Sequence, residues 1–389
     1  MCVDLDAFFA SVEELLHPEW RGLPLLVGGR PNERGVVASC SYAARAFGVR
    51  SAMPMGRALQ LCPKAIVTPG RHALYREHSQ RVMAILHEYG CPVEQVSVDE
   101  VFIDASEGAA SWRGARALAA DMKQRIRTEV GLPSTIGIAS NKLVAKIASN
   151  QGKPNGLLEV HAGNESSFLA PLAIGKLWGV GPKGAAHLEK MGIHTIGDLQ
   201  RAPLGGLQAE FGQWALDMQR KALGIDSSLV STDHEPRSVS RETTFTRDVG
   251  DLTQLKRVLL SLTEEMAHDL RAEGLQAGTI AIKLRWASFE TITRQTTLPQ
   301  PSDSATVIYK SASALLAAAI SKGGKVRLLG VRGTRLAGGR QLSMFDEGGE
   351  KRVRLNQAVD DIREKFGEEA LRRAALVKKE KPKGSRKMA

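Results

Sequence analysis

The sequence predicts a multidomain α+β protein, and three observations carry that prediction. Residues 1–160 follow the order strand, helix, two strands, helix and strand, which is the order of a ferredoxin-like sheet. Short helices and glycine turns follow from Leu169. Beyond a polar segment, residues 240–338 alternate strands with two long helices. A chain of 389 residues is long enough for several such cores.

Composition narrows the classes of partner. The formal net charge is +11, which favours a polyanion such as nucleic acid. The four cysteines (Cys2, Cys40, Cys62 and Cys91) are dispersed without a C-x-x-C pair, which argues against a zinc site or a disulfide framework and for a reducing compartment. No apolar run reaches membrane-spanning length, and the early charge at Asp4 excludes a signal peptide before it.

Acidic residues interrupt two apolar strands of the first region. Asp99 and Glu100 lie in a predicted hairpin between Val93 and Asp104, and Asp4 lies in the predicted strand Cys2–Leu5. If the segments pair, the carboxylates converge, and such hard oxygen ligands suit Mg²⁺ or Mn²⁺. On these residues alone a solvated acidic hairpin tip is an equal alternative.

The first region also predicts its helices in order. Asp6 is expected to be the N-cap of a helix that runs to Leu16, and Asn141 the N-cap of a helix over 142–149. The remaining elements are strands at 24–29, 35–40 and 134–140, and helices at 42–47, 55–62, 75–89 and 112–130.

Three polar side chains of this region are candidate phosphate ligands. Tyr42 and Arg45 are three residues apart and share one helical face, an arrangement that grips phosphate oxygens but also occurs on ordinary surfaces. Lys153 lies in a predicted turn, Lys-Pro-Asn-Gly. There it is either a phosphate contact or a solvated charge.

A helix-hairpin-helix is predicted around Gly179 and Gly181. The Gly-x-Gly turn exposes backbone N–H groups at the start of a helix, and Lys183 adds a cation, which together suit a DNA phosphate. An ordinary helical hairpin with a glycine turn is the alternative.

The region after a linker at 227–239 predicts a second α+β domain with a basic sheet face. Such a face can follow a duplex backbone, although charge on an outer sheet face also serves solubility. The basic residues expected to line that one face are Lys283, Arg285, Arg294, Arg332 and Arg335. Beyond the domain, Gln341–Phe345 is a candidate docking peptide, 355–377 a charged helix, and 378–389 a basic disordered tail.

Four motifs together resemble the Y-family translesion DNA polymerases, most closely the bacterial DNA polymerase IV (DinB) type. They are Val3–Glu13, Ala38–Pro54, Ser97–Glu100 and Gly152–Gly156, and the resemblance runs in order to about Phe345. The resemblance implies a right-hand polymerase. Its parts would be a ferredoxin-like palm (1–5 and 70–160), small fingers (6–69), a helix-hairpin-helix thumb (161–226), the linker (227–239), a little finger (240–338), and a C-terminal region (339–389).

The resemblance also implies residue roles. Asp4, Asp99 and Glu100 match the catalytic metal-binding carboxylates, and the Leu5 carbonyl matches a backbone ligand. Ser39, Tyr42, Arg45 and Lys153 match residues that hold the nucleotide triphosphate, and Phe9 matches the steric gate against a ribose 2′-OH. The clamp-binding peptide would use Gln341, Leu342, Met344 and Phe345.

The implied activity is low-fidelity, template-directed addition of dNMP to a primer 3′-OH with release of pyrophosphate, in DNA damage tolerance. It implies two Mg²⁺ ions, which Mn²⁺ can replace. The implied partners are primer-template DNA, dNTP and a sliding β clamp. The resemblance further implies a bacterial monomer that is cytoplasmic, associated with the nucleoid and not bound to membranes. Two rivals are a nucleotide cyclase, whose Gly-rich acidic hairpin motif is absent, and a DNA-binding accessory protein with a vestigial site.

Overall fold

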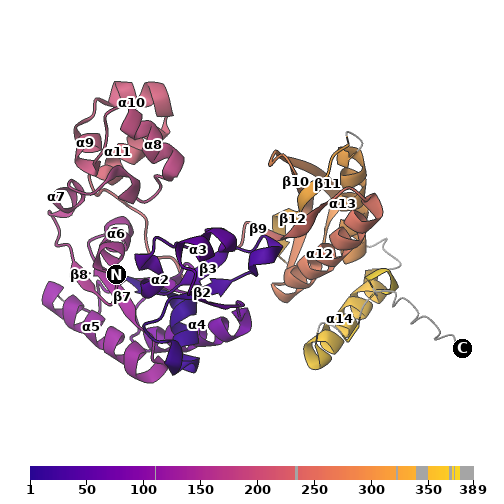
Figure 1. The fold of residues 1–389 in the computed structure, drawn as a ribbon, viewed down its shortest axis with the longest axis horizontal. Coiled ribbons are helices and arrows are strands. Elements are labelled where there is room, and N and C mark those ends of the chain that lie inside the picture. The colour runs from indigo at the N-terminus through magenta and orange to yellow at the C-terminus, as the bar shows by residue number, and fades with distance from the viewer. Residues whose placement is uncertain are drawn as a thin grey trace, which may run out of the picture. The chain divides into compact units, whose positions relative to one another are not determined.

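The computed structural model describes residues 1–109, 111–232, 235–320, 323–338, 349–367, 370–371 and 373–376. Its contacts divide the chain into two compact units, unit 1 (Met1–His234) and unit 2 (Glu235–Ala389), whose folds are drawn in Figure 1. Among the helices in the described ranges, none has the length and apolarity needed to cross a membrane.

Unit 1 is built on a five-stranded sheet in the order β5-β6-β1-β7-β8. The strands are β1 (Cys2–Leu5), β5 (Val93–Gln95), β6 (Glu100–Ile103), β7 (Ser134–Ile138) and β8 (Leu157–Glu159). β1 pairs antiparallel with both β6 and β7, so the predicted ferredoxin-like order is confirmed. β8, which was not predicted, adds itself parallel to β7.

Helices cover both faces of this sheet. Successive side chains of β1 point to opposite faces, so each face has side chains to bury. Val3 and Leu5 join the core formed with α4 (His72–His87) and α5 (Trp112–Arg125). Cys2 lies on the other face and packs with Ala145 of α6 (Lys142–Gly152). Asp4 shares this second face with Cys2, and the central strand therefore presents its one carboxylate toward α6.

One predicted helix ends differently from the prediction, and the predicted start of another is confirmed. The predicted helix 112–130 changes after Arg125 into a π-helical turn, Ile126–Val130, which ends at Gly131 with φ 84°. Asn141 is confirmed as an N-cap, since its side chain accepts a hydrogen bond from the Val144 N–H.

An insertion after β1 forms a smaller sheet in the order β3-β2-β4. Its elements are α1 (Phe8–Leu16), η1 (Pro18–Trp20), β2 (Leu25–Gly28), η2 (Pro31–Glu33), β3 (Val37–Cys40), α2 (Tyr42–Ala46), α3 (Met55–Leu61) and β4 (Ile66–Thr68). It has its own small core, to which Leu26, Val37 and Met55 belong.

A helical region follows β8. It comprises α7 (Glu165–Leu169), η4 (Ile174–Lys176), α8 (Pro182–Lys190), α9 (Ile196–Arg201), α10 (Leu204–Phe211) and α11 (Trp214–Ala222). The first helix of the expected helix-hairpin-helix is only the 3₁₀ turn η4, and α8 is the second. α9 begins with a capping box between Thr195 and Asp198.

The first half of the expected linker is fastened to unit 1. The Asp226 carboxylate accepts from the Leu143 N–H, the Leu229 carbonyl accepts from Lys142 Nζ, and the Ser231 N–H donates to Glu94 Oε2. At its other end, β9 already begins at Ser238, so the last two residues expected as linker are strand.

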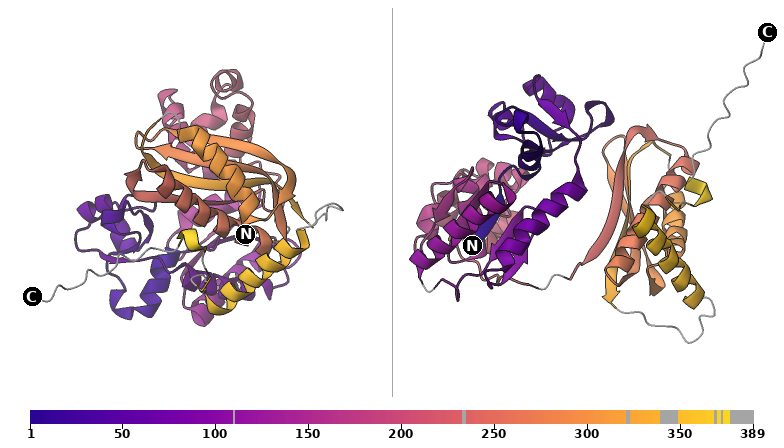
Figure 2. Two further views of the ribbon diagram at one scale, coloured as in Figure 1. Left: turned by 90° about the vertical axis from the view of Figure 1, so that its right-hand side faces the viewer. Right: turned by 90° about the horizontal axis from the view of Figure 1, so that it is seen from below.

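Unit 2 is a four-stranded sheet in the order β11-β10-β12-β9 with two helices on one face, as Figure 2 shows. Its elements are β9 (Ser238–Val249), α12 (Leu252–Ala272), β10 (Leu275–Trp286), β11 (Thr291–Ser302), α13 (Ala305–Ile320) and β12 (Val326–Gly338). Ile280, Ile282 and Leu284 of β10 are buried in the core with the helices, and the intervening side chains therefore lie on the other face.

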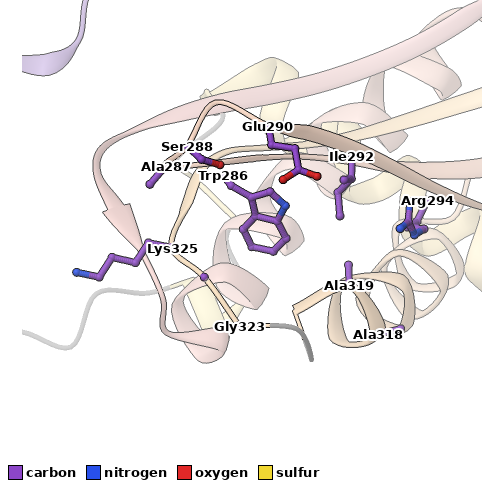
Figure 3. Close-up of a pocket in the computed structure, with 11 residues that line it drawn as sticks. Trp286, Ala287, Ser288, Glu290, Ile292, Arg294, Ala318, Ala319, Gly323 and Lys325 are labelled. Carbon is purple, nitrogen blue, oxygen red and sulfur yellow. The ribbon is translucent and has the colours of Figure 1, made fainter.

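The expectation that the basic residues share one sheet face is wrong for Arg294. Lys283 and Arg285 alternate with the core residues, and Arg332 is in register with Ala281 on their face. Arg294 instead pairs with Ile282, a core residue, which puts it on the helix side. There Arg294 and Ile292 line a pocket together with Ala318 and Ala319 of α13 (Figure 3). The sequence alone could not place Arg294, because the pairing of β11 with β10 decides on which face of the sheet its side chain lies.

The C-terminal helix α14 spans Gly349–Phe366, so the predicted range 355–377 is wrong at both ends. Gly367, with φ 89°, follows its last residue, and a 3₁₀ turn, η5 (Ala374–Leu376), comes after. α14 lies on the helix side of unit 2, where Asp360 accepts hydrogen bonds from Arg271 and from the His268 ring of α12. Arg363 forms a further ion pair with Glu264 of α12.

We expect Asp360→Asn to loosen α14 from α12. Burial opposes the charge of Asp360, but hydrogen bonds from Arg271 and His268 hold its pKa below the ordinary value. Its contribution to docking is therefore full at neutral pH and is lost as the pH falls below about 4. The substitution should lower the stability of the docked helix by about 2 kcal/mol at pH 7, measured by hydrogen exchange of α14. Asp361→Asn changes the same charge at an exposed neighbour and should leave exchange unchanged; equal effects of the two variants would contradict the assigned contact.

Candidate active site

Two acidic side chains face each other at the centre of the unit 1 sheet. Asp4 of β1 is in register with Glu100, the first residue of β6, and both point toward α6. Asp4 is only 5% exposed. Two carboxylates so placed repel each other and lose solvation, so each requires a positive partner.

Lys146 of α6 is that partner. Its Nζ lies 2.9 Å from Asp4 Oδ2 and 2.5 Å from Glu100 Oε2. Burial opposes the charge of Lys146, but Asp4, Cys2 and Glu100 outweigh it and raise its pKa above the ordinary lysine value. Lys146 was missed by the sequence analysis. The available signal was one basic residue within the apolar run Leu143–Ala148 of the predicted helix.

Lys153 reaches the same carboxylate from the turn after α6. Its Nζ lies 2.6 Å from Asp4 Oδ1, so each oxygen of Asp4 accepts from a different lysine. The residue predicted as a phosphate contact is thereby brought to the acidic site itself.

Asp99 joins the site from the bend that precedes β6. The Leu5 N–H donates to the Asp99 carbonyl at 2.9 Å, which places the two backbones side by side at the end of β1. The Asp99 carboxylate accepts a hydrogen bond from Ser97 Oγ at 2.6 Å. The structure therefore brings the backbones of Asp4, Leu5, Asp99 and Glu100 to one end of the sheet, and the convergence of the three carboxylates on a cation stays a prediction.

The donor set fits a divalent cation. Hard carboxylate oxygens are the ligands that Mg²⁺ and Mn²⁺ prefer, and two ammonium groups already bind at Asp4 and Glu100. Within the described residues, no three acidic, histidine or cysteine side chains are yet arranged to hold a metal ion. The contacts explain this, since Lys146 bridges two of the carboxylates and Ser97 engages the third.

The candidate phosphate-binding side chains lie in the insertion. The Arg45 guanidinium lies 4.8 Å from the centre of the Tyr42 ring, so the predicted shared face is confirmed. Arg45 Nε also donates to the Cys40 carbonyl. Ser39 is buried in β3, where it pairs with Val27 of β2. Burial and the neighbouring Asp6 raise the pKa of the Tyr42 hydroxyl, which therefore remains a hydrogen-bond donor at neutral pH.

The prediction that Asp6 is an N-cap is wrong. Ala7 occupies that position with φ 45°, and no side chain caps α1. The Asp6 carboxylate is buried and accepts hydrogen bonds from Thr135 Oγ1, the Asn155 N–H and the Tyr42 hydroxyl. Capping preferences could not anticipate these contacts because two of the partners follow more than a hundred residues later. Asp6 thus connects the main sheet, the turn after α6, and the insertion.

Phe9 lies half-buried on α1 among other rings. The centre of its ring is 4.2 Å from that of Tyr75, 5.5 Å from Phe8 and 5.8 Å from His72.

The remaining candidate residues belong to the helical region of unit 1, to unit 2, or to segments outside the described residues. Gly181 immediately precedes α8, Gly179 has φ 102°, and Lys183 is exposed in the first turn of α8. Lys283 is paired with Glu242 on the exposed face of unit 2. Gln341, Leu342, Met344 and Phe345 lie outside the described residues.

Comparison with known proteins gives matches along nearly the whole chain. Residues 3–150 match the impB/mucB/samB family, residues 236–344 match the C-terminal domain of that family, and residues 175–215 match the thumb domain of DNA polymerase iota. A DNA polymerase IV of Dehalococcoides mccartyi (strain CBDB1) is 41% identical over 369 residues, which is 94% of either chain. One from Desulfatibacillum aliphaticivorans is 41% identical over 96% of either chain.

Solved structures resemble the fold. A Y-family DNA polymerase chimera of Dbh and Dpo4 has a TM-score of 0.80 and 28% identity, covering 87% of this chain and 99% of its own. DinB from Sulfolobus solfataricus has a TM-score of 0.61 and 28% identity, covering 86% of this chain and 97% of its own.

We expect Asp6→Ala to destabilise unit 1 by about 3 kcal/mol, because it removes the buried acceptor shared by Thr135, Asn155 and Tyr42. Chemical denaturation followed by fluorescence measures this change. Asp121→Ala is the matched control, since Asp121 also accepts from a tyrosine hydroxyl, that of Tyr89, but at an exposed position. A loss no larger than that of the control would contradict the structural role of Asp6.

Proposed function

We propose that this chain, which belongs to the impB/mucB/samB family and is a Y-family DNA polymerase, transfers dNMP from dNTP to a primer 3′-OH. A template directs the transfer, and pyrophosphate is released. The observation that carries the proposal is the pairing of buried Asp4 with partly buried Glu100, held together by Lys146 beside Asp99. The family uses divalent metal ions, and we propose two Mg²⁺ ions, replaceable by Mn²⁺, held by Asp4, Asp99, Glu100 and the Leu5 carbonyl.

Bound there, Mg²⁺ would lower the pKa of the primer hydroxyl and offset the charge on the departing pyrophosphate. The protein groups bind and orient the reactants. Asp4 is fixed on a central strand, so its oxygens are held in place before substrate arrives. Lys146 maintains the spacing of Asp4 and Glu100.

Tyr42, Arg45, Lys153 and Ser39 would hold the triphosphate. The planar guanidinium of Arg45 and the ammonium of Lys153 supply opposite charge, and the Tyr42 hydroxyl supplies a neutral donor. Lys153 is 2.6 Å from Asp4, which supports a triphosphate position directly beside the carboxylates. Phe9 would lie beneath the sugar as the steric gate.

The domain assignments follow the same proposal. Residues 1–5 and 70–160 would be the palm, 6–69 the fingers, 161–226 the thumb, and 240–338 the little finger. Gly179, Gly181 and Lys183 would contact DNA phosphates from the thumb, and Lys283, Arg285 and Arg332 from the exposed sheet face of the little finger. Arg294 is not proposed for that face.

A role in DNA damage tolerance is supported by the small fingers. Ala38 and Ala52 present small side chains where the family covers the nascent base pair, and a loose cover admits lesions and mismatches at the expense of fidelity. We propose action as a monomer in the bacterial cytoplasm, at the nucleoid. The nucleotide cyclase alternative loses support from the match to DNA polymerase IV over the chain, and the accessory-protein alternative from the intact carboxylate set.

Replacing Asp99 with Asn should reduce primer extension by at least ~100-fold, because one ligand charge is lost where the reacting atoms are positioned. Binding of primer-template, measured by fluorescence anisotropy, should stay within about threefold, since phosphate contacts dominate DNA affinity. Asp104→Asn, five residues along the hairpin with its carboxylate on Ser106, is the control and should retain activity. Full extension by the Asp99 variant would remove the metal-site proposal.

Deleting Gln341–Phe345 should spare distributive synthesis and abolish stimulation by a sliding clamp, because the peptide would supply the apolar docking contact. Product lengths with and without purified clamp measure both properties. The double change Asp346→Ala and Glu347→Ala alters the adjacent residues and should keep the stimulation. Equal clamp affinity after the deletion would rule out this peptide.

A further inference from the structure

We propose that Tyr75, held by Glu13 and Arg71, is a positioning residue that fixes the Phe9 ring and thereby sets discrimination against ribonucleotides. The proposal rests on the proposed function of Phe9 as the gate under the sugar. It assigns a specificity-determining role to a residue of α4, which lies outside the fingers segment that carries Phe9.

The Phe9 ring has a rigid backing. It is stacked on the Tyr75 ring at 4.2 Å between centres and 15° between planes, and Tyr75 is 1% exposed. His72, also of α4, meets Phe9 edge to face at 5.8 Å and 88°. A gate ring excludes a hydroxyl only if it cannot retreat, and Tyr75 fills the space into which Phe9 would withdraw.

An ion pair at the buried Glu13 carboxylate holds Tyr75 in turn. Its hydroxyl donates to Glu13 Oε1, and Arg71 donates to both oxygens of the same carboxylate. Glu13 is 0% exposed, so its charge depends on these donors. Burial and the hydrogen bond to Glu13 raise the pKa of Tyr75 to about 12, so the hydroxyl stays a donor throughout the range in which polymerases are assayed.

The spacing of Phe9 and Glu13 connects the two contacts. They are four residues apart on α1 and therefore lie on one helix face. Tyr75 touches both, with its ring on Phe9 and its hydroxyl on Glu13. Any tilt of the Tyr75 ring that would free Phe9 must also break the hydrogen bond to a buried carboxylate, which is why the gate is held at one height.

The test compares the ratio of kcat/KM for dCTP to that for rCTP, opposite template guanine, in the full-length protein. Tyr75→Leu should lower the ratio about tenfold, chiefly by raising rCTP use, with dCTP use within about threefold. Tyr75→Phe keeps the ring but removes the hydroxyl, and should lower the ratio by about threefold. Tyr89→Phe removes the same kind of tyrosine–carboxylate bond, to Asp121, just beyond the end of α4, and should leave the ratio unchanged.

Phe9→Ala and the double variant Phe9→Ala/Tyr75→Leu complete a cycle. Phe9→Ala should lower the ratio further than either Tyr75 variant, and adding Tyr75→Leu should change nothing more. If Phe9→Ala lowers the ratio while both Tyr75 variants reduce dCTP and rCTP use equally, Tyr75 is only structural and the proposal is overturned, whereas the gate stands. If Phe9→Ala leaves the ratio unchanged, the gate itself fails and the positioning role fails with it. Tyr75→Phe keeps the core volume, so it decides the question even if Tyr75→Leu does not fold.

Discussion

Repulsion between Asp4 and Glu100 is the constraint around which unit 1 is arranged. The pairing of β1 with β6 puts the two carboxylates opposite each other on a nearly buried face, where separate charges would be strongly unfavourable. Lys146 resolves the conflict by bonding to both. Because Lys146 belongs to α6, the charge balance also determines how that helix lies over the central strand.

Under the proposed function, the same arrangement would let a divalent cation bind at the carboxylates without rebuilding the fold. Lys146 and Lys153 already neutralise the carboxylates, so a divalent cation would exchange for ammonium groups at oxygens that are fixed in place. Once a cation had displaced Lys153 from Asp4, the lysine would be free to bind the negatively charged triphosphate of the incoming nucleotide. Asp6 supports the arrangement from behind, since Thr135, Asn155 and Tyr42 all donate to it. The main sheet and the insertion are thereby held in one geometry.

Features determined by local sequence were predictable, and those determined by tertiary contact were not. Asn141 was identified as an N-cap because capping depends on the next three residues, and the ferredoxin-like order follows from the periodicity of successive segments. Asp6 has the same local pattern as a cap, but distant donors decide its role. The carboxylate partners of Lys146 could be identified only once β1 was known to lie beneath α6, and Arg294 could be placed only from the register of β11 against β10.

The most direct test of the account is a titration of Mn²⁺ into the protein with primer-template and a non-hydrolysable dNTP, followed by electron paramagnetic resonance. The account predicts that Asp4→Asn weakens Mn²⁺ binding at least ~10-fold relative to the unaltered chain. Unchanged Mn²⁺ affinity in that variant would show that the central carboxylate is a partner for lysine alone, which would contradict the proposed metal site.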